Sequence, residues 1–563
     1  MNERHVWLLG ALALMLFPLA AAGQLLPGSV DETYELPLAA PTGLAWDGTF
    51  FWAADRFTAT IARIHPESGR VVERLEAPGH EPMGLAWDGE RLWCVDAADK
   101  TAYALLPNEG LTVKALELET PSPQGIGWDG EGLWISDGRA GELIRIDGQD
   151  GTTVRTLSLP TARMKGRSEV IGIAFSEGRI WLSERAHDTI FAVDRESGEV
   201  LDYFDAPGPY PAGLAWDGDH LWCLDYERRA LDKVNVLCGG AYTIDGAKKE
   251  HVVYQERWRN YGPGTVKTLD IYLAVPGDLP NQKILDPPRF EPHPTEFLLD
   301  PWGQNVAHFR FEDVGPGEEA GAVMEVDAEI RRVRWRIEPD LAGTLDEIPP
   351  EIAAQFLADE TKLALDSQVI RKAVREAVGD ERNAYRVALD IYRYIQDRMH
   401  YELSGGWNVA PTVLERGSGS CSEYTFVMIA MCRAAGLPAR YQGSVVIRGD
   451  DASRDDVFHR WVEVFLPNYG WIPVDPSGGD SDTPWVRARY FGELNSRFLI
   501  TTVGGGASPY LGWNYNSDAS WTAEGRVELK TFRHGDWSPV DKTYEPGLED
   551  AFVGGRGGTG IGP

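Results

Sequence analysis

The most informative motifs of this chain lie in the stretch Gly417–Asp475. It opens with GSGSCSEY at Gly417–Tyr424, continues as FHRWVEVF at Phe458–Phe465 and closes with GWIPVDP at Gly470–Pro476. Between the first two of these pieces lie an apolar run, a strand-like segment and a polar loop. Three residues that can carry chemistry stand, in chain order, at three different element boundaries: Cys421, His459 and Asp475.

The first piece predicts a helix that begins at the cysteine. Ser420 followed three residues later by Glu423 is a capping-box pattern, which places Cys421 in the first turn. The positive end of a helix dipole favours a thiolate, and the free N–H groups of that turn can receive an oxyanion. A reactive thiol is therefore expected at Cys421. Cys432, on the same helix, is expected to be a small buried hydrophobe.

The other two pieces predict neighbouring strands. His459 opens one alternating segment, and Asp475 ends a second, shorter one. Two adjacent strands beside the helix would bring together a nucleophile, a base and a group that orients the base. Each residue alone also has an ordinary explanation, since a histidine often lies at a polar strand edge and Asp-Pro often marks a turn. The three together in this framework favour the catalytic interpretation.

These motifs resemble the bacterial transglutaminase-like superfamily. The resemblance rests on the Gly-x-Cys entry, the His-x-Trp-Val-Glu-Val strand and the Gly-Trp-Ile-x-Val-Asp-Pro ending. It implies a papain-like α+β core with Cys421, His459 and Asp475 as catalytic triad. The implied reaction is attack on an amide carbonyl and formation of an acyl-enzyme thioester. Resolution by an amine would cross-link proteins, and resolution by water would make the enzyme a peptidase or deamidase.

Composition suggests an exported protein of several domains. The chain has 563 residues and a formal net charge of −32, which argues against nucleic acid as a partner. Residues 1–23 combine basic residues, an apolar run and a small-residue cleavage site, so they predict a signal peptide. A single membrane anchor is the alternative, but the run is short for one. A periplasmic or extracellular location without stable membrane insertion is expected. Five cysteines, an odd number, argue against a disulfide framework.

Residues 24–240 repeat a unit that begins Gly-Leu-Ala-Trp-Asp-Gly. Its copies start at Gly43, Gly84, Gly125, Gly172 and Gly213, at steps of 41, 41, 47 and 41 residues. About four short strands per unit predict an all-β propeller of about five blades. A sixth blade with an unrecognisable repeat is the alternative. The early strand 30–38 is expected to complete the last blade. The repeats resemble the NHL type, which implies a binding or scaffolding platform and does not name its ligand. A protein or a glycan is the candidate ligand of the propeller. The repeated Trp and Asp residues are expected to be structural.

The remaining chain predicts two further parts and a tail. Residues 241–345 contain longer alternating strands between Gly/Pro turns, which predict a β-sandwich. Residues 346–545 form the predicted transglutaminase-like domain, with helices before Cys421 and with strands at 489–503 and 525–531 expected to complete its sheet. The Gly-rich tail 546–563 predicts disorder.

Two functions from different classes remain open on this sequence. The first is a thiol enzyme acting on a protein or peptide substrate. The second is a non-catalytic binding or scaffold protein, in which the propeller binds a partner and the transglutaminase-like fold is an interaction module. No Asp/Glu cluster with calcium-loop spacing is present, so neither metal nor cofactor is expected. Trp407 and Gln442 are available as oxyanion donors, but no family position assigns either one.

Overall fold

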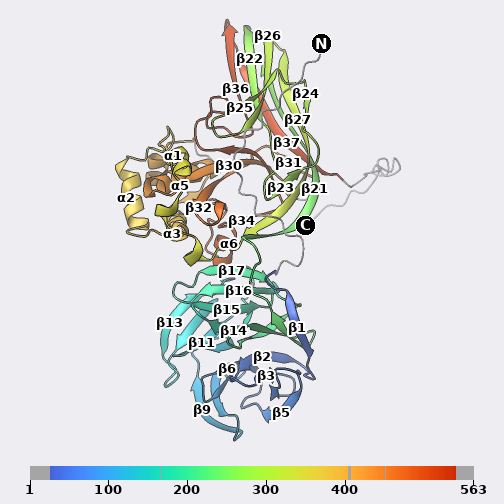
Figure 1. Cartoon of the computed structure of the whole chain (residues 1–563), viewed down its shortest axis with the longest axis vertical. Helices are drawn as coiled ribbons and strands as arrows, with labels where there is room; N and C mark the ends of the chain where they lie inside the picture. Colours follow the sequence, from blue (N-terminus) through green and yellow to red (C-terminus); the bar gives the residue numbers. More distant parts are fainter. Residues whose placement is uncertain (1–25, 167, 404–406, 450–451, 541–563) are drawn as a thin grey trace, which may run out of the picture.

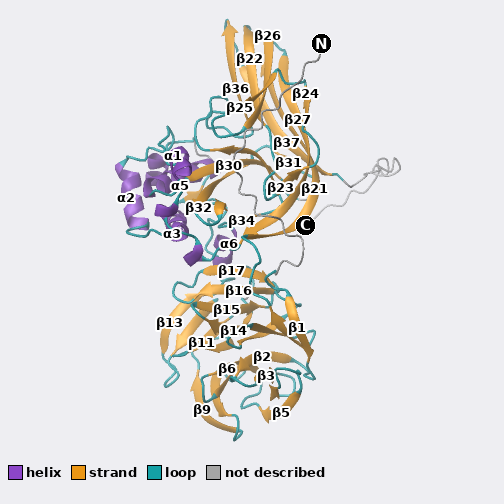
Figure 2. Cartoon of the chain, viewed as in Figure 1, coloured by secondary structure: helices purple, strands orange, loops and turns teal. Residues whose placement is uncertain are grey.

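The computed structural model describes residues 26–166, 168–403, 407–449 and 452–540, which form a propeller, a β-sandwich and an α+β core. In Figure 1 the propeller lies at one end of the long axis and the sandwich at the other. The α+β core lies between them, with its helices on one side. Figure 2 shows that strands dominate outside this core. The predicted signal peptide and Gly-rich tail lie outside the described residues.

The propeller has five blades, as the repeat predicts. Each blade is a four-stranded antiparallel sheet. Blade one contains β2 (Pro41–Trp46), β3 (Phe51–Asp55), β4 (Thr60–Ile64) and β5 (Val71–Glu76), and blade two contains β6 (Pro82–Trp87), β7 (Leu92–Asp96), β8 (Thr101–Leu106) and β9 (Leu111–Glu117). Blade three contains β10 (Pro123–Trp128), β11 (Leu133–Asp137), β12 (Glu142–Ile146) and β13 (Thr153–Ser158). Blade four contains β14 (Val170–Ser176), β15 (Arg179–Glu184), β16 (Thr189–Asp194) and β17 (Val200–Asp205).

The fifth blade closes the ring with the first strand of the chain. It contains β18 (Pro211–Trp216), β19 (Leu221–Asp225) and β20 (Ala230–Val234), and β1 (Val30–Glu35) pairs antiparallel with β20. The innermost strands β18 and β2 also contact each other, so blade five packs on blade one. The prediction that the early strand completes the last blade is confirmed. Because the ring is closed, every blade has two neighbours.

The repeated aspartates and tryptophans of the blades are joined by hydrogen bonds. Asp47 accepts a hydrogen bond from the Trp52 indole at 2.8 Å and from the backbone N–H groups of the turn between them. The same indole–carboxylate bond recurs in three more blades, in the pairs Trp93–Asp88, Trp134–Asp129 and Trp222–Asp217. In the degenerate fourth repeat Ser176 takes the place of the aspartate, 2.8 Å from Trp181. Their structural role is confirmed.

We expect residues 24–240 to fold when expressed alone. The fragment contains all five blades and the closing strand, so every blade keeps both of its neighbours and only short outer strands remain as edges. Circular dichroism should show β structure and a cooperative thermal transition. A matched fragment that begins at residue 37 lacks β1 and should melt at a lower temperature, because β20 then has an open edge. An unfolded longer fragment would contradict the expectation.

The sandwich consists of two sheets from distant parts of the chain. One sheet orders β23 (Gln282–Ile284), β27 (Glu319–Trp335), β21 (Tyr242–Asn260), β37 (Leu529–Pro539) and β31 (Arg454–Asp455), with β24 (Arg289–Glu291) and β34 (Glu493–Leu494) also paired to β27. The other orders β25 (Glu296–Leu299), β26 (Asn305–Val314), β22 (Thr265–Ala274) and β36 (Ser517–Glu524).

Strands β36 and β37 belong to the sandwich, which contradicts one prediction from the sequence. The expectation that a strand at 525–531 completes the sheet of the predicted transglutaminase-like domain is wrong. β37 instead pairs with β21, from Asn260↔Leu529 to Glu250↔Pro539, and β36 pairs with β22. The physical reason is burial, because Trp537 is 3% exposed and lies in the same core as Val252. The chain therefore returns to the sandwich after the α+β core.

The α+β core is built around one helix that is buried except at its C-terminal end. Helix α5 (Cys421–Ala435) packs against a sheet ordered β33 (Gly470–Val474), β32 (His459–Leu466), β30 (Ala439–Val446) and β35 (Phe498–Gly504). The surrounding elements are η1 (Pro339–Leu341), η2 (Leu345–Glu347), α1 (Pro350–Phe356), α2 (Gln368–Ala377), α3 (Ala384–Arg398), β28 (His400–Tyr401), α4 (Ala410–Arg416), β29 (Ser418–Gly419) and α6 (Pro484–Arg489). The strand expected within 489–503 does join the sheet of the α+β core, as β35, which pairs with β30.

Blade four of the propeller contacts both the α+β core and the sandwich. Trp485 on α6 packs edge-on against Phe191 and Tyr203, with ring centroids 5.3 and 5.7 Å apart. Arg334 on β27 lies over the Tyr203 ring, and Arg336 forms an ion pair with Asp202. Figure 1 shows α6 directly against β17. The loop that follows Asp475 thus leads into the element that holds the propeller.

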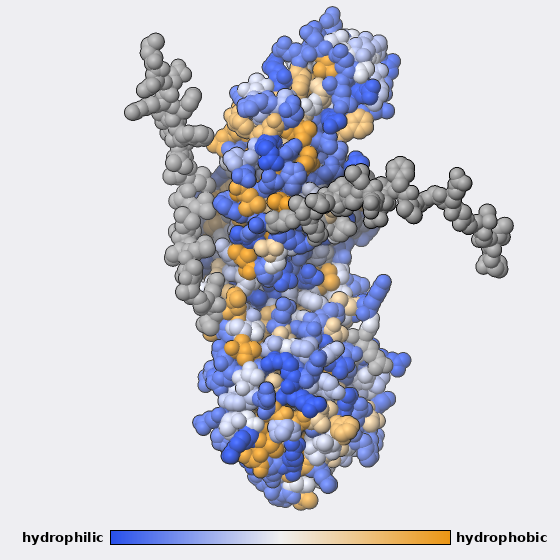
Figure 3. All heavy atoms as spheres, turned by 90° about the vertical axis from the view of Figure 1, so that its right-hand side faces the viewer, coloured by the Kyte–Doolittle hydropathy of each residue, from blue (hydrophilic) through white to orange (hydrophobic). Residues whose placement is uncertain are grey.

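Among the described residues, no helix is long and apolar enough to cross a membrane. The face seen in Figure 3 is mainly hydrophilic, and its hydrophobic residues form small separate groups.

Candidate active site

The structure places Cys421 in the first turn of α5, at the position that the capping pattern predicts. Glu423 accepts a hydrogen bond from the Ser420 N–H at 3.2 Å and forms an ion pair with Arg416 at 2.8 Å. Gly417 ends α4 with a φ of 75°, a left-handed conformation that glycine adopts without strain. Cys421 is 6% exposed, so its sulfur lies just below the surface at the helix N-terminus.

His459 and Asp475 meet across two adjacent strands. β32 pairs with β33, and Asp475 Oδ2 lies 2.6 Å from His459 Nε2. The other carboxylate oxygen of Asp475 accepts hydrogen bonds from the Ser477 hydroxyl and the Gly478 N–H, both at 2.8 Å. Although burial raises the pKa of Asp475, the charge and hydrogen bond of His459 lower it below its ordinary value. Asp475 is thus an anion in a fixed orientation.

The second imidazole nitrogen faces the thiol. Asp475 occupies Nε2 of His459, so Nδ1 is the nitrogen that is left for the Cys421 thiol, which interacts with this imidazole. Burial alone would raise the pKa of Cys421, but His459 and the neighbouring Arg460 bring it below its ordinary value. Burial likewise opposes the charge on His459, but Asp475 and Cys421 raise its pKa above the ordinary value. These opposite shifts favour a thiolate–imidazolium pair.

A buried carboxylate fixes the start of β32. Asp455 is fully buried and accepts hydrogen bonds from the Phe458 N–H at 3.0 Å and the Val446 N–H at 2.8 Å. Phe458 has a φ of 59°, which is unusual for a bulky residue and is maintained by these contacts. The turn directs His459 into the site. Sequence reasoning missed Asp455, because a carboxylate in a polar loop gives no signal of burial.

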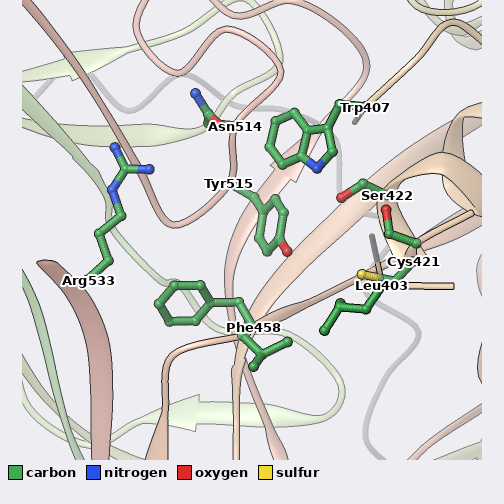
Figure 4. A pocket seen from close by; sticks show the side chains of 10 residues that line it. Leu403, Trp407, Cys421, Ser422, Phe458, Asn514, Tyr515 and Arg533 are labelled. Atoms are coloured by element: carbon green, nitrogen blue, oxygen red, sulfur yellow. The ribbon is translucent and has the colours of Figure 1, made fainter. Parts of the chain in front are cut away.

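A pocket of about 210 Å³ opens beside Cys421. Its walls come from α5, the turn before β32, the loop before β36 and strand β37 of the sandwich. Figure 4 shows the Tyr515 hydroxyl turned toward Cys421 and Ser422, with Arg533 on the opposite wall. Of the two side chains considered as oxyanion donors, Trp407 lines this pocket, whereas the pocket lining does not include Gln442. Sequence reasoning missed Phe458, Tyr515 and Arg533, which come from separate loops and a distant strand.

The buried cysteines elsewhere differ from Cys421 in environment. Cys432 is fully buried in the α5 core, and Cys94 and Cys223 lie in propeller blades at 1% exposure. Burial raises the pKa of all three thiols. They are therefore poor nucleophiles near neutral pH.

Part of the α+β core matches a family model. Residues 371–476 match the model of the transglutaminase-like superfamily. A protein-glutamine gamma-glutamyltransferase from Pseudomonas aeruginosa is 33% identical over 101 residues, which is 16% of this chain and 15% of the relative. The chain thus spans only a small part of that relative's length.

Solved structures give low similarity scores. A candidate cysteine protease from Cytophaga hutchinsonii aligns with a TM-score of 0.38 and 15% identity, over 53% of this chain and all of that one. The Cps50 (Swd1) β-propeller domain from Myceliophteria thermophila aligns with a TM-score of 0.28 and 10% identity, over 38% of this chain and all of that domain. These low TM-scores support no functional conclusion.

Proposed function

We propose, on the premise that residues 371–476 form a transglutaminase-like domain, that this protein is a thiol enzyme that forms an acyl-enzyme from an amide. Cys421 is the nucleophile, His459 the acid and base, and Asp475 the residue that orients His459. The observation that carries the proposal is the chain of contacts from Asp475 through His459 to Cys421, together with the opposite pKa shifts of the thiol and the imidazole.

The proposed first half-reaction follows from these positions. The Cys421 thiolate attacks the amide carbonyl carbon, and the carbonyl oxygen becomes an oxyanion. N–H groups at the start of α5 are unpaired within the helix and are available to stabilise this charge. Protonated His459 then donates its Nδ1 proton to the leaving nitrogen as the C–N bond breaks. An amine is released, and a thioester on Cys421 remains.

The second half-reaction decides the class of enzyme. His459, now neutral, removes a proton from an incoming amine or water, which attacks the thioester and regenerates the thiolate. With an amine the product is a new amide and the enzyme is a protein-glutamine γ-glutamyltransferase. With water the product is a carboxylate and the enzyme is a peptidase or deamidase. We propose a protein or peptide as the acyl donor in either case.

One experiment distinguishes these outcomes. The full mature chain is incubated with a glutamine-containing casein and a labelled primary amine, with and without EDTA. Incorporation of label indicates transfer to an amine, whereas new peptide termini or glutamate in place of glutamine indicate hydrolysis. We expect turnover to survive EDTA, because the proposed steps use only a thiol, an imidazole and backbone donors. No reaction of any kind, with Cys421 inert to iodoacetamide, would contradict the enzyme proposal.

A second candidate function is binding by the propeller. A pocket of about 480 Å³ lies between loops of blades one, two and five, and its lining includes Arg56, Phe57, His80, Glu81 and Tyr226. Phe57 is 82% exposed there, beside the Arg56–Glu81 ion pair at 3.5 Å. Exposed aromatic and charged groups of this kind suit a protein or glycan ligand. Phe57→Ala should weaken capture of that ligand while leaving the reactivity of Cys421 unchanged.

We also propose export. The support is the pattern of residues 1–23. The test is mass spectrometry of the protein from a bacterial culture that expresses the full chain, after separation of periplasm, medium and cytoplasm. An N-terminus near Gln24 in the first two fractions would support export, and an intact Met1 in the cytoplasm would contradict it.

A further inference from the structure

Arg460, the residue after His459, is a buried cation without an acidic partner. Its side chain is 0% exposed, and no carboxylate among the described residues forms an ion pair with it. Nη2 donates a hydrogen bond to the Trp513 carbonyl, but Nε and Nη1 have no partner in the described part of the chain. A buried charge left in this state is strongly destabilising unless another charge compensates it.

Aromatic rings surround the guanidinium on several sides. Its central carbon lies between 4.3 and 5.3 Å from the ring centroids of Trp407, Phe426, Tyr441 and Tyr515. The electron-rich faces of such rings attract a cation, more strongly where water is excluded. The rings therefore keep the charge in place, but they carry no negative charge of their own. The compensating anion has to come from elsewhere.

Cys421 is the neighbouring group that can provide this anion. The groups that act electrostatically on Arg460 are Tyr441, Tyr515 and Cys421. Burial raises the pKa of both tyrosines, so they stay neutral near pH 7. Two rings of the cage, Trp407 and Tyr515, also line the pocket beside Cys421. Although burial opposes it, His459 and Arg460 lower the pKa of the Cys421 thiol below its ordinary value. His459, Tyr401 and Tyr515 are the other titratable groups that act on Cys421, while Asp475 acts through His459.

We propose that Arg460 is a fourth charged residue of the site, a positioning residue whose caged guanidinium stabilises the Cys421 thiolate. The order of charges is then Asp475 negative, His459 positive, Cys421 negative and Arg460 positive, which sums to zero. Without Arg460 the same site would carry a net negative charge in a buried environment. The inference rests on the proposed function, because it requires Cys421 to be the thiolate nucleophile. It adds a residue to which sequence reasoning assigned no role.

The test measures the pH dependence of Cys421 alkylation by iodoacetamide, read by mass spectrometry of the labelled peptide. Arg460→Met removes the charge at similar length, and Arg460→Lys keeps it. We expect Arg460→Met to move the half-maximal pH upward by about one unit, which slows alkylation about tenfold on the acid side and leaves the high-pH plateau unchanged. Arg460→Lys should lie between this variant and the wild type. Superimposable wild-type and Arg460→Met profiles would overturn the inference.

A second measurement needs no reactive thiol. In the Cys421→Ala chain Arg460 loses its anion, so we expect Cys421→Ala/Arg460→Met to melt at a higher temperature than Cys421→Ala alone. A double variant that melts lower, or does not fold, would overturn the inference. The outcomes also separate the two proposals. If wild-type Cys421 alkylates only with the profile of an ordinary thiol, the proposed function fails. If the wild type is reactive at low pH and Arg460→Met matches it, only the role of Arg460 fails.

Discussion

Cys421→Ala is expected to reduce acyl-enzyme formation more than about a thousandfold, without unfolding the protein. Alanine has no nucleophile, so no thioester can form at this position. The fold should persist because Cys421 lies at the end of α5 beside an open pocket and contributes little to the packed core. The measurement is mass spectrometry of the chain after reaction with an activated ester of a glutamine peptide. Circular dichroism checks the fold.

Cys432→Ala is the matched control for this experiment. It removes the same side chain from the same helix, but Cys432 is fully buried among apolar residues. We expect it to lower the free energy of unfolding by roughly 1 kcal/mol and to leave thioester formation close to that of the wild type. Acylation of the Cys421→Ala chain, or loss of acylation in the Cys432→Ala chain, would contradict the assignment of the nucleophile.

His459→Ala is expected to slow acylation at neutral pH nearly as much as Cys421→Ala does. It should also change the pH dependence of acylation. A thiol with a lowered pKa is charged above that lowered value, and an imidazole with a raised pKa stays protonated up to that raised value. The reactive pair therefore exists between the two values, and wild-type reactivity should persist below the ordinary thiol pKa of about 8.5. Without His459 burial dominates, so the thiol should react only above that pH.

The measurement is the alkylation rate of Cys421 from about pH 5 to 10, in wild type and variant. Asp475→Asn is the graded comparison, because it disturbs only the orientation and charge of His459. It should retain roughly ten to a hundred times more acylation than His459→Ala. The double variant Cys421→Ala/Asp475→Asn should be no slower than Cys421→Ala, since the residues act as a unit. If His459→Ala kept the wild-type profile, His459 could not be the partner of the thiol.

Much of the molecule is determined by patterns that are local in sequence. The indole–carboxylate pair of four blades, and the Trp181–Ser176 pair of the remaining blade, each join residues five positions apart, so the marks of the repeat predict both the blades and their number. The start of α5 at Cys421 follows from Ser420 and Glu423, because a helix terminus is stabilised by its own nearest residues. The strand positions of His459 and Asp475 follow from alternation within a few residues.

Only the tertiary structure decided how distant segments complete the site. β37 reads as one more strand of the catalytic core, but it pairs with β21 and brings Arg533 to the pocket beside Cys421. Strand pairing between distant segments depends on which face finds a core to bury, and a short strand carries too little information to specify its partner. The sequence assigns Arg460 no role. Its burial is decided by aromatic rings from α5, β30 and two separate loops, which meet only when the chain has folded.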